Sequence, residues 1–372
     1  MNPTVAAAVI AASASTLTLI GTLAAQYLGR RATSKDTQRA FQEQSEHLDR
    51  TLTEQWTRAF NERFTTAADQ LGSDKPAVRL AGVYAMAGLA DDWEAKRQTC
   101  VDVLCAYLRM PNETDPGQNA PEPRRLAFQA NREVRHTVIR VIAAHLQKDT
   151  PSAKSWQRLN FDFTGVVFDG GDFMDTQFSG GTVLFTEAKF SGGAVLFNRA
   201  EFSGGKIYFN LIQVLDGLLD FSNAQFSGGE IYFNAAEFSS LMVSFIKARF
   251  TGSEIYFGAV FSGGLNSFSE AQFSGGEVEF GLSEFSGGEV SFRGAEFSGG
   301  SVSFSGAKFS GSRVDFSPAV SDDTGELVET RFSGGEVDFS DVGDWSFPPA
   351  FPWTDLPPSG VKLPKKANQS QA

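Results

Sequence analysis

The sequence predicts an α+β fold in which a helical N-terminal part precedes a β-solenoid, a stack of short repeated coils. Phenylalanine recurs at fixed intervals between Phe161 and Phe339, and Ser-Gly-Gly turns separate many of these intervals. The residues before Phe161 show helical patterns instead. A fixed period indicates stacked units, because a stack buries one continuous core that no single unit could bury alone.

The repeat starts with a spacing of five residues and then lengthens. The first four phenylalanines, five residues apart, are Phe163, Phe168, Phe173 and Phe178. A later series, twelve residues apart, comprises Phe185, Phe197, Phe209, Phe221, Phe233, Phe245 and Phe257. An apolar residue two positions before each later Phe shares its face of the extended chain. Twelve residues therefore correspond to two five-residue units plus a two-residue glycine insertion at one corner.

These units resemble the pentapeptide-repeat family, most plainly at residues 166–170, 171–175 and 176–180. The family pattern is a small residue, any residue, Leu or Phe, and two more. The resemblance implies a right-handed quadrilateral β-helix with four five-residue sides to a coil and the central residue pointing inward. It covers about half the chain. The glycine insertions depart from the pattern and would give a coil of roughly 24 residues with two bulged corners.

A coil of this length predicts a core made of phenylalanine columns. Successive coils lie about 4.8 Å apart, so rings in one column can stack with an offset and add to plain area burial. One expected column contains Phe185, Phe209, Phe233, Phe257, Phe280 and Phe304. A second contains Phe178, Phe202, Phe226, Phe250, Phe273 and Phe297.

The predicted solenoid is strongly acidic. Between Phe161 and Ser340 there are 24 acidic and 9 basic residues, a net charge of −15, against −12 for the whole chain. The 24-residue period places Glu230, Glu254 and Glu277 in one column. Like charges at this distance repel, although exposure and salt screen them. The column is either a solvated face that resists edge pairing or an acidic stripe for a basic partner. Direct nucleic-acid binding is not expected, because phosphate requires Lys and Arg.

The segment 318–330 interrupts the repeat. It carries Asp322, Asp323 and Glu326 and is expected to protrude as a side loop. This loop is either a loose edge of the solenoid or a contact loop for a partner.

The chain begins with an apolar stretch that carries no charge between Val5 and Leu28. This length can cross a bilayer as a helix. A retained anchor is favoured over a cleaved signal peptide, because the first four residues include no Lys or Arg; a buried helix is the other alternative. Basic residues follow at Arg30, Arg31, Lys35 and Arg39. The positive-inside rule then predicts a single-pass protein of the cell membrane with its C-terminal bulk in the cytoplasm.

A polar helical segment from residue 33 to 71 carries one apolar stripe, formed by Phe41, Leu48, Leu52, Trp56, Phe60 and Phe64. It either docks on its own domain or pairs with a second copy as a short coiled coil. A homodimer through this helix or through a solenoid end is therefore one expectation.

The predicted divisions are an anchor at 1–31, an amphipathic helix or stalk at 32–72, a helical capping domain at 73–156, the β-helix at 157–340, and a C-terminal cap and disordered tail at 341–372.

The capping domain is expected to contain helices starting near Pro76, from Trp93 to Met110, and from residue 132 to 147. Residues 70–74, 77–85 and 102–111 resemble the helical region of membrane-tethered pentapeptide-repeat proteins of actinobacteria. Only two cysteines occur, Cys100 and Cys105, on different helix faces, so neither an easy disulfide nor a zinc site is predicted.

Both ends of a β-helix expose unpaired strand edges. We expect the helical domain to cover one end near Trp156. The Pro- and Trp-rich tail, residues 345–353, is expected to cover the other. A polyproline ligand for another domain is the alternative interpretation of the tail.

No convergent set of catalytic groups appears in the sequence. His47, His136 and His145 stand alone, and no phosphate-binding loop, dinucleotide fingerprint or Cys/His cluster occurs. No enzyme activity, cofactor or metal is predicted. The favoured function is a non-catalytic, membrane-tethered scaffold for an unknown protein partner. One alternative is an acidic nucleic-acid mimic that binds a DNA-handling enzyme such as a type II topoisomerase, because some pentapeptide-repeat proteins resemble a DNA duplex in width and charge and protect these enzymes. Extracellular adhesion would require the opposite membrane orientation.

Overall fold

The computed structural model describes residues 22–23, 26, 41–239 and 242–365. The chain divides into two compact units, residues 1–63 and 64–372. Residues 41–63 of the first unit are helical, as are residues 64–71 of the second. Within the described ranges, no helix is long and apolar enough to cross a membrane. The predicted anchor between Val5 and Leu28 lies almost entirely outside those ranges and stays a prediction.

A helical region precedes the solenoid in the second unit. It comprises α2 (Pro76–Asp92), the short 3-10 helix η1 (Glu94–Lys96), α3 (Arg97–Arg109) and α4 (Glu122–Leu146). Pro76 opens α2, where the missing N–H and fixed φ of proline suit the first helical turn. α4 begins at Glu122, so the predicted start at residue 132 was ten residues too late; Pro123 lies in the first turn, where proline is tolerated.

The two cysteines lie inside this helical region on α3. Both are buried and unbridged. Burial raises the pKa of the Cys100 thiol to about 11 and that of Cys105 to about 12. Both therefore stay protonated and unreactive at neutral pH.

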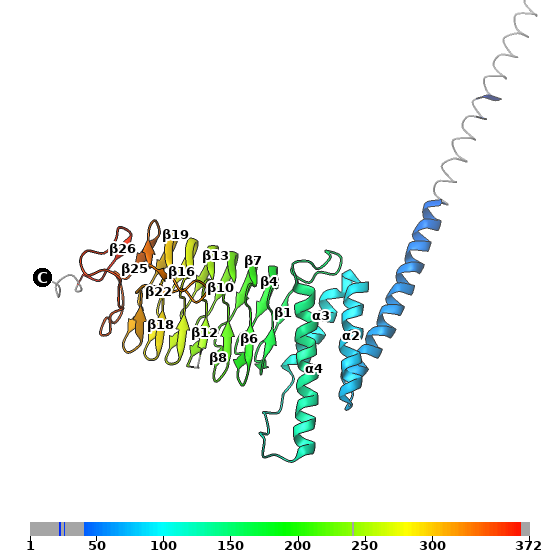
Figure 1. Ribbon diagram of the computed structural model, residues 1–372. Helices are drawn as coiled ribbons and strands as arrows, with labels where there is room; N and C mark the ends of the chain where they lie inside the picture. Colours follow the sequence, from blue (N-terminus) through cyan, green and yellow to red (C-terminus); the bar gives the residue numbers. More distant parts are fainter. Residues whose placement is uncertain (1–21, 24–25, 27–40, 240–241, 366–372) are drawn as a thin grey trace, which may run out of the picture. The chain divides into compact units, whose positions relative to one another are not determined.

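Three parallel sheets build the solenoid (Figure 1). The first, called the long sheet, contains β1 (Phe161–Asp162), β4 (Gln177–Leu184), β7 (Glu201–Tyr208), β10 (Gln225–Tyr232), β13 (Arg249–Tyr256), β16 (Gln272–Glu279), β19 (Glu296–Ser303), β24 (Arg331–Phe332), β25 (Glu336–Asp338) and β26 (Val361–Lys362).

The second sheet contains β2 (Val167–Phe168), β5 (Lys189–Phe190), β8 (Gln213–Val214), β11 (Glu237–Phe238), β14 (Val260–Phe261), β17 (Glu284–Phe285) and β20 (Lys308–Phe309). The third contains β3 (Gly171–Asp172), β6 (Ala194–Leu196), β9 (Leu218–Asp220), β12 (Met242–Ser244), β15 (Leu265–Ser267), β18 (Glu289–Ser291) and β21 (Arg313–Asp315). Each coil visits the long, second and third sheets in turn, so neighbouring strands in a sheet belong to successive coils.

The strand register confirms the 24-residue coil. Phe226 pairs with Phe202 on one side and Phe250 on the other, each 24 residues away. The next step, from Phe250 to Phe273, is 23 residues. The missing residue is absorbed at a corner, where the Ala259 N–H donates to the carbonyl of Phe257, two residues back instead of three. The solenoid makes about eight turns.

The predicted phenylalanine columns are confirmed. In the first, Phe209 stacks on Phe185 and on Phe233 with ring centroids 4.6 and 4.8 Å apart. In the second, Phe226 stacks on Phe202 and Phe250 at 5.0 and 4.9 Å. Rings of a third column, such as Phe221, meet the first column edge-on, at 89° to Phe209. Each ring named in these columns is at most 1% exposed. Burial of one such ring therefore contributes about 1.5–3 kcal/mol to the free energy of unfolding.

The Ser-Gly-Gly turns lie where the chain of one coil approaches the backbone of the previous one. Gly205 has a φ of +79°, and a Cβ atom there would lie 2.4 Å from the carbonyl oxygen of Gly181. The strand register shifts at the same place. Glycine permits both the left-handed conformation and the close approach, and this is why the insertion bulges the corner without breaking the stack.

Both ends of the solenoid are in contact with other parts of the unit. At the first coil, Trp156 is fully buried and the Arg109 guanidinium forms a 2.6 Å ion pair with Asp162. At the last coils, Trp345 packs edge-on against Phe309 at 5.3 Å, and Phe351 stacks against Phe316 at 5.4 Å. Residues 366–372, the last part of the predicted cap and tail, lie outside the described residues.

A matched pair of glycine substitutions tests the corner geometry. Gly205→Ala is expected to lower the free energy of unfolding by about 2–5 kcal/mol, because left-handed strain adds to overlap with the neighbouring backbone. Gly192 also has a positive φ, +81°, but no atom lies within 4 Å of its added Cβ. Gly192→Ala should therefore cost only the strain, about 1–2 kcal/mol. Urea denaturation measures both, and equal losses would contradict the proposed role of close approach.

Candidate interaction surface

The outer surface of the long sheet carries two adjacent columns of polar side chains, here called the acidic–tyrosine face. It consists of Glu230, Glu254, Glu277 and Glu279 together with Tyr208, Tyr232 and Tyr256. The strand pleat explains their position. In β10, Ile231 is 1% exposed and points into the core, so its neighbours Glu230 and Tyr232 point outward.

The glutamate column is confirmed by the register. Glu254 pairs directly with Glu230 in β10 and with Glu277 in β16. At one end, Lys206 is the partner of Glu230 and its Nζ lies 2.7 Å from the Glu230 carboxylate. Within the described residues, neither Glu254 nor Glu277 forms an ion pair with a basic side chain. Two neighbouring charges therefore remain uncompensated on an exposed, rigid surface.

A tyrosine column runs beside the glutamates. Tyr232 stacks on Tyr208 and on Tyr256, with ring centroids 5.0 Å apart in both pairs. The Tyr232 hydroxyl donates a hydrogen bond to Glu230, and that bond raises the pKa of the Tyr232 phenol well above its usual range. The Tyr256 hydroxyl donates to Glu254 at 3.3 Å. Sequence reasoning missed this column, although its 24-residue spacing matched that of the phenylalanines.

Glu279 takes the place of tyrosine in the next coil, because it pairs with Tyr256. Burial raises the pKa of the Glu279 carboxyl, and the negative charge of Glu277 raises it further. The acidic–tyrosine face thus becomes more negative toward β16, where Glu254, Glu277 and Glu279 meet.

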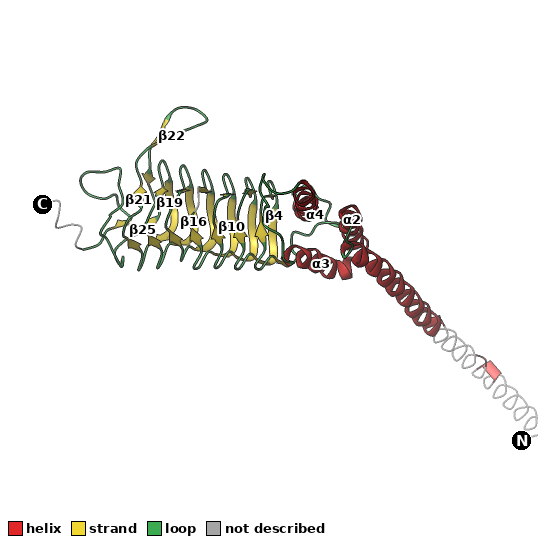
Figure 2. Cartoon of the chain, turned by 90° about the horizontal axis from the view of Figure 1, so that it is seen from below, coloured by secondary structure: helices red, strands yellow, loops and turns green. Residues whose placement is uncertain are grey.

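The predicted side loop is the turn of an antiparallel hairpin, β22 (Ala319–Val320) and β23 (Leu327–Val328), which projects from the solenoid (Figure 2). Asp322, Asp323 and Glu326 are exposed there. Asp323 forms an ion pair with Lys247 on the solenoid wall. Among the described residues, no hydrogen bond or ion pair joins these three carboxylates to the glutamate column. The structure therefore separates the candidate residues into two acidic regions.

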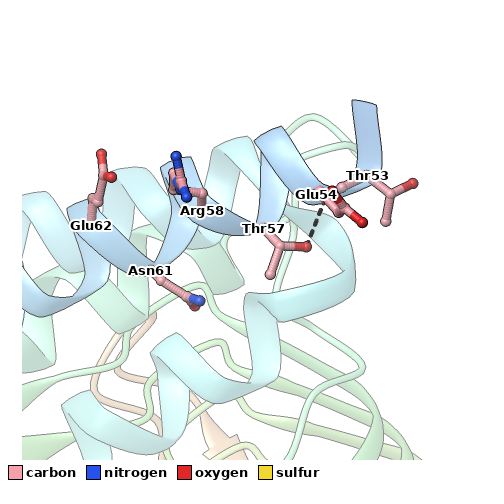
Figure 3. Close-up of a pocket in the computed structure, with 6 residues that line it drawn as sticks. All are labelled: Thr53, Glu54, Thr57, Arg58, Asn61 and Glu62. Atoms are coloured by element: carbon pink, nitrogen blue, oxygen red, sulfur yellow. Dashed lines mark hydrogen bonds between the residues drawn. The ribbon is translucent and has the colours of Figure 1, made fainter. Parts of the chain in front are cut away.

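A surface hollow in the first unit offers no converging chemistry. Figure 3 shows its lining, which comes from a single helix and comprises Thr53, Glu54, Thr57, Arg58, Asn61 and Glu62. The Thr57 hydroxyl donates to the carbonyl of Thr53 at 2.8 Å, an ordinary bond within a helix. Across the described part of the chain, no group of three His, Cys, Asp or Glu side chains could hold a metal ion.

Comparisons with known proteins found no matching family model, no similar curated protein and no similar solved structure. The fold is a parallel β-solenoid with regular phenylalanine ladders, preceded by a helical region.

The repulsion between the carboxylates of Glu277 and Glu279 is expected to lower the free energy of unfolding, which can be measured. The folded state raises the pKa of Glu279 above the value of 4.5 for a free carboxyl, so stability falls as pH rises from 4.5 through the folded pKa. Glu279→Gln should therefore raise the free energy of unfolding at pH 7 by about 0.2–1 kcal/mol, and the gain should vanish below pH 4.

Urea denaturation at the two pH values supplies the measurement. The control is Glu237→Gln, since Glu237 is an exposed carboxylate on the second sheet. An equal gain from the control would show that overall net charge, and not the contact with Glu277, causes the effect.

Proposed function

We propose that this chain is a non-catalytic scaffold for protein–protein interaction whose acidic–tyrosine face binds a basic segment of a partner protein. The observation that carries the proposal is a cluster of three carboxylates, those of Glu254, Glu277 and Glu279. Among the described residues they form no ion pair with a basic side chain, and they lie beside stacked, half-exposed tyrosines. Lysine or arginine side chains of a partner would relieve the repulsion between these carboxylates. Arginine would in addition stack on the tyrosine rings.

The spacing of the face favours a helical partner. Successive glutamates belong to neighbouring strands and so lie about 4.8 Å apart along the solenoid axis, or roughly 9.6 Å over two steps. On an α-helix, residues i, i+3 or i+4, and i+7 share one face and rise about 4.5–6 Å and 10.5 Å. An extended peptide repeats on one face only every 6.6–6.8 Å, about two residues. A basic helix parallel to the solenoid axis therefore matches the column better than a strand does.

The solenoid is further proposed to be a right-handed quadrilateral β-helix of the pentapeptide-repeat kind. Five-residue spacing from Phe163 to Phe178 supports this assignment, as does the 24-residue coil with two glycine corners. Such a rod holds its outward side chains at fixed distances, so a partner meets a preformed surface and the face loses little conformational entropy on binding.

A synthetic helical peptide tests the proposed partner. A peptide with lysines at i, i+3, i+7 and i+10 is expected to bind the detergent-solubilised full chain more tightly than a scrambled peptide of the same composition. Removing two charges with the double variant Glu254→Gln/Glu277→Gln should weaken binding about tenfold and reduce its salt dependence. Fluorescence anisotropy gives the dissociation constants.

Glu237→Gln is the matched control, since it removes an exposed carboxylate from the second sheet. It should leave peptide affinity unchanged. Equal affinities for the two peptides, or equal weakening by the control variant, would contradict recognition by the acidic–tyrosine face.

The scaffold is proposed to be held at the cytoplasmic side of the cell membrane by the apolar stretch between Val5 and Leu28. The basic residues that follow this stretch support the orientation. The intact chain is expected in the membrane fraction after alkaline carbonate extraction, and deletion of residues 1–31 should release it. Recovery of the intact chain in the soluble fraction would rule out the anchor.

The nucleic-acid mimic remains the second candidate, favoured by the net charge of −15 along the repeat. At about 4.8 Å per coil, the rod would be roughly 36 Å long. Inhibition of gyrase supercoiling by the purified chain would favour this function. Failure to inhibit, together with binding of the basic helix, would favour the scaffold.

A further inference from the structure

A cavity of about 400 Å³ lies in the helical region, where α2, α3 and α4 meet. It belongs to neither acidic region described above. Its charged and polar lining includes Asp74, Arg79, Tyr107, Glu113, Asn131 and Arg135. The two arginines come from different helices and face the same cavity, which brings two positive charges together.

Arg79 has only neutral hydrogen-bond acceptors. Its Nη1 donates to the carbonyl of Ser73 at 3.0 Å, and its Nη2 donates to the side-chain oxygen of Asn131. Its Nε is buried and has no hydrogen-bond partner. Among the described residues, no carboxylate forms an ion pair with this guanidinium. A partly buried cation without an ion-paired carboxylate is costly unless an anion approaches it.

Arg135 is more deeply buried, at 6% exposed. Its Nη1 donates to the carbonyl of Leu108 at 2.7 Å and its Nη2 to that of Val167 at 3.0 Å. Burial lowers the pKa of Arg135, and the charge of Asp169 opposes that effect. Asp169, however, already forms an ion pair with Arg132 and a hydrogen bond with His136, each at 2.9 Å. Among the described residues, no carboxylate forms an ion pair with Arg135 itself.

Tyr107 on α3 adds a neutral donor between these cations. Burial raises the pKa of its phenol, while the charges of Arg79 and Arg135 act in the opposite direction. Both guanidiniums are thus close enough to influence the hydroxyl. The phenol stays protonated at neutral pH and can donate its hydrogen to an acceptor in the cavity.

We propose that this cavity binds a small anion bearing a phosphate or a carboxylate group, held by Arg79, Arg135 and Tyr107. The planar fork of arginine presents paired N–H groups that fit the oxygens of either group. Asp74 and Glu113 also line the cavity, but both are exposed to solvent, which screens their charge. A bound anion would connect three helices of the region that contacts the first coil.

Isothermal titration calorimetry on the detergent-solubilised full chain tests the site, with inorganic phosphate in one arm and acetate in the other. We expect saturable binding to a single site. Arg79→Gln keeps a similar length and an amide donor but removes the charge, so it should weaken binding at least about tenfold. The anion that binds more tightly identifies the chemical class of the ligand.

Two further variants make the result specific. Arg124→Gln removes an exposed arginine of α4 that does not line the cavity, and it should leave binding unchanged. Tyr107→Phe keeps the ring and should weaken binding about threefold to tenfold, which supports the site even if Arg79→Gln misfolds. Absence of saturable binding by both anions would overturn the proposal. Equal weakening by Arg79→Gln and Arg124→Gln would overturn it as well.

Glu113→Gln provides a test in the opposite direction. Removing this negative charge from the lining should strengthen anion binding about twofold to threefold at low salt, with a smaller gain at high salt. Weaker anion binding in this variant would contradict the expected electrostatic attraction between the anion and the two arginines.

Discussion

The stacking of phenylalanine on phenylalanine from coil to coil is the constraint on which the solenoid depends. Rings such as Phe209 and Phe233 lie 4.8 Å apart and nearly parallel, a separation that equals the spacing of neighbouring strands. Ring stacking and strand hydrogen bonding therefore favour the same register. A shift by one residue would turn every ring toward solvent, which explains why the register survives a one-residue deletion after Phe250.

Glycine corners and phenylalanine columns act together. A twelve-residue interval contains two residues more than two five-residue sides. Glycines such as Gly205 let these two inserted residues lie directly against the backbone of the previous coil. The insertion gives the long sheet strands of eight residues, such as β10 and β13, where the second sheet has strands of two. A long strand carries two outward residues side by side, and this geometry creates paired columns on one face.

The acidic–tyrosine face follows from that rigid grid. In a flexible chain, Glu254 and Glu277 would move apart, but the register fixes them in adjacent strands. Tyrosine hydroxyls stabilise part of the negative charge by hydrogen bonding, since Tyr232 donates to Glu230. The remaining carboxylates repel one another, and a cationic partner would reduce that repulsion. In the cavity of the helical region, Arg79 of α2 and Arg135 of α4 line one hollow, and no carboxylate among the described residues forms an ion pair with either guanidinium. We propose a basic partner for the acidic–tyrosine face and a small anion for the two arginines.

The sequence by itself determined the solenoid, its 24-residue coil, the phenylalanine columns and the alignment of Glu230, Glu254 and Glu277, because a strict period converts chain distance directly into spatial position. It also placed Asp322, Asp323 and Glu326 on a projecting loop. Only the tertiary structure decided that Asp323 is tied to Lys247 and that Arg79 and Arg135 line one cavity. These contacts join residues whose separations follow no repeat, so they depend on how helices and loops pack, and a periodic pattern carries no information about that packing.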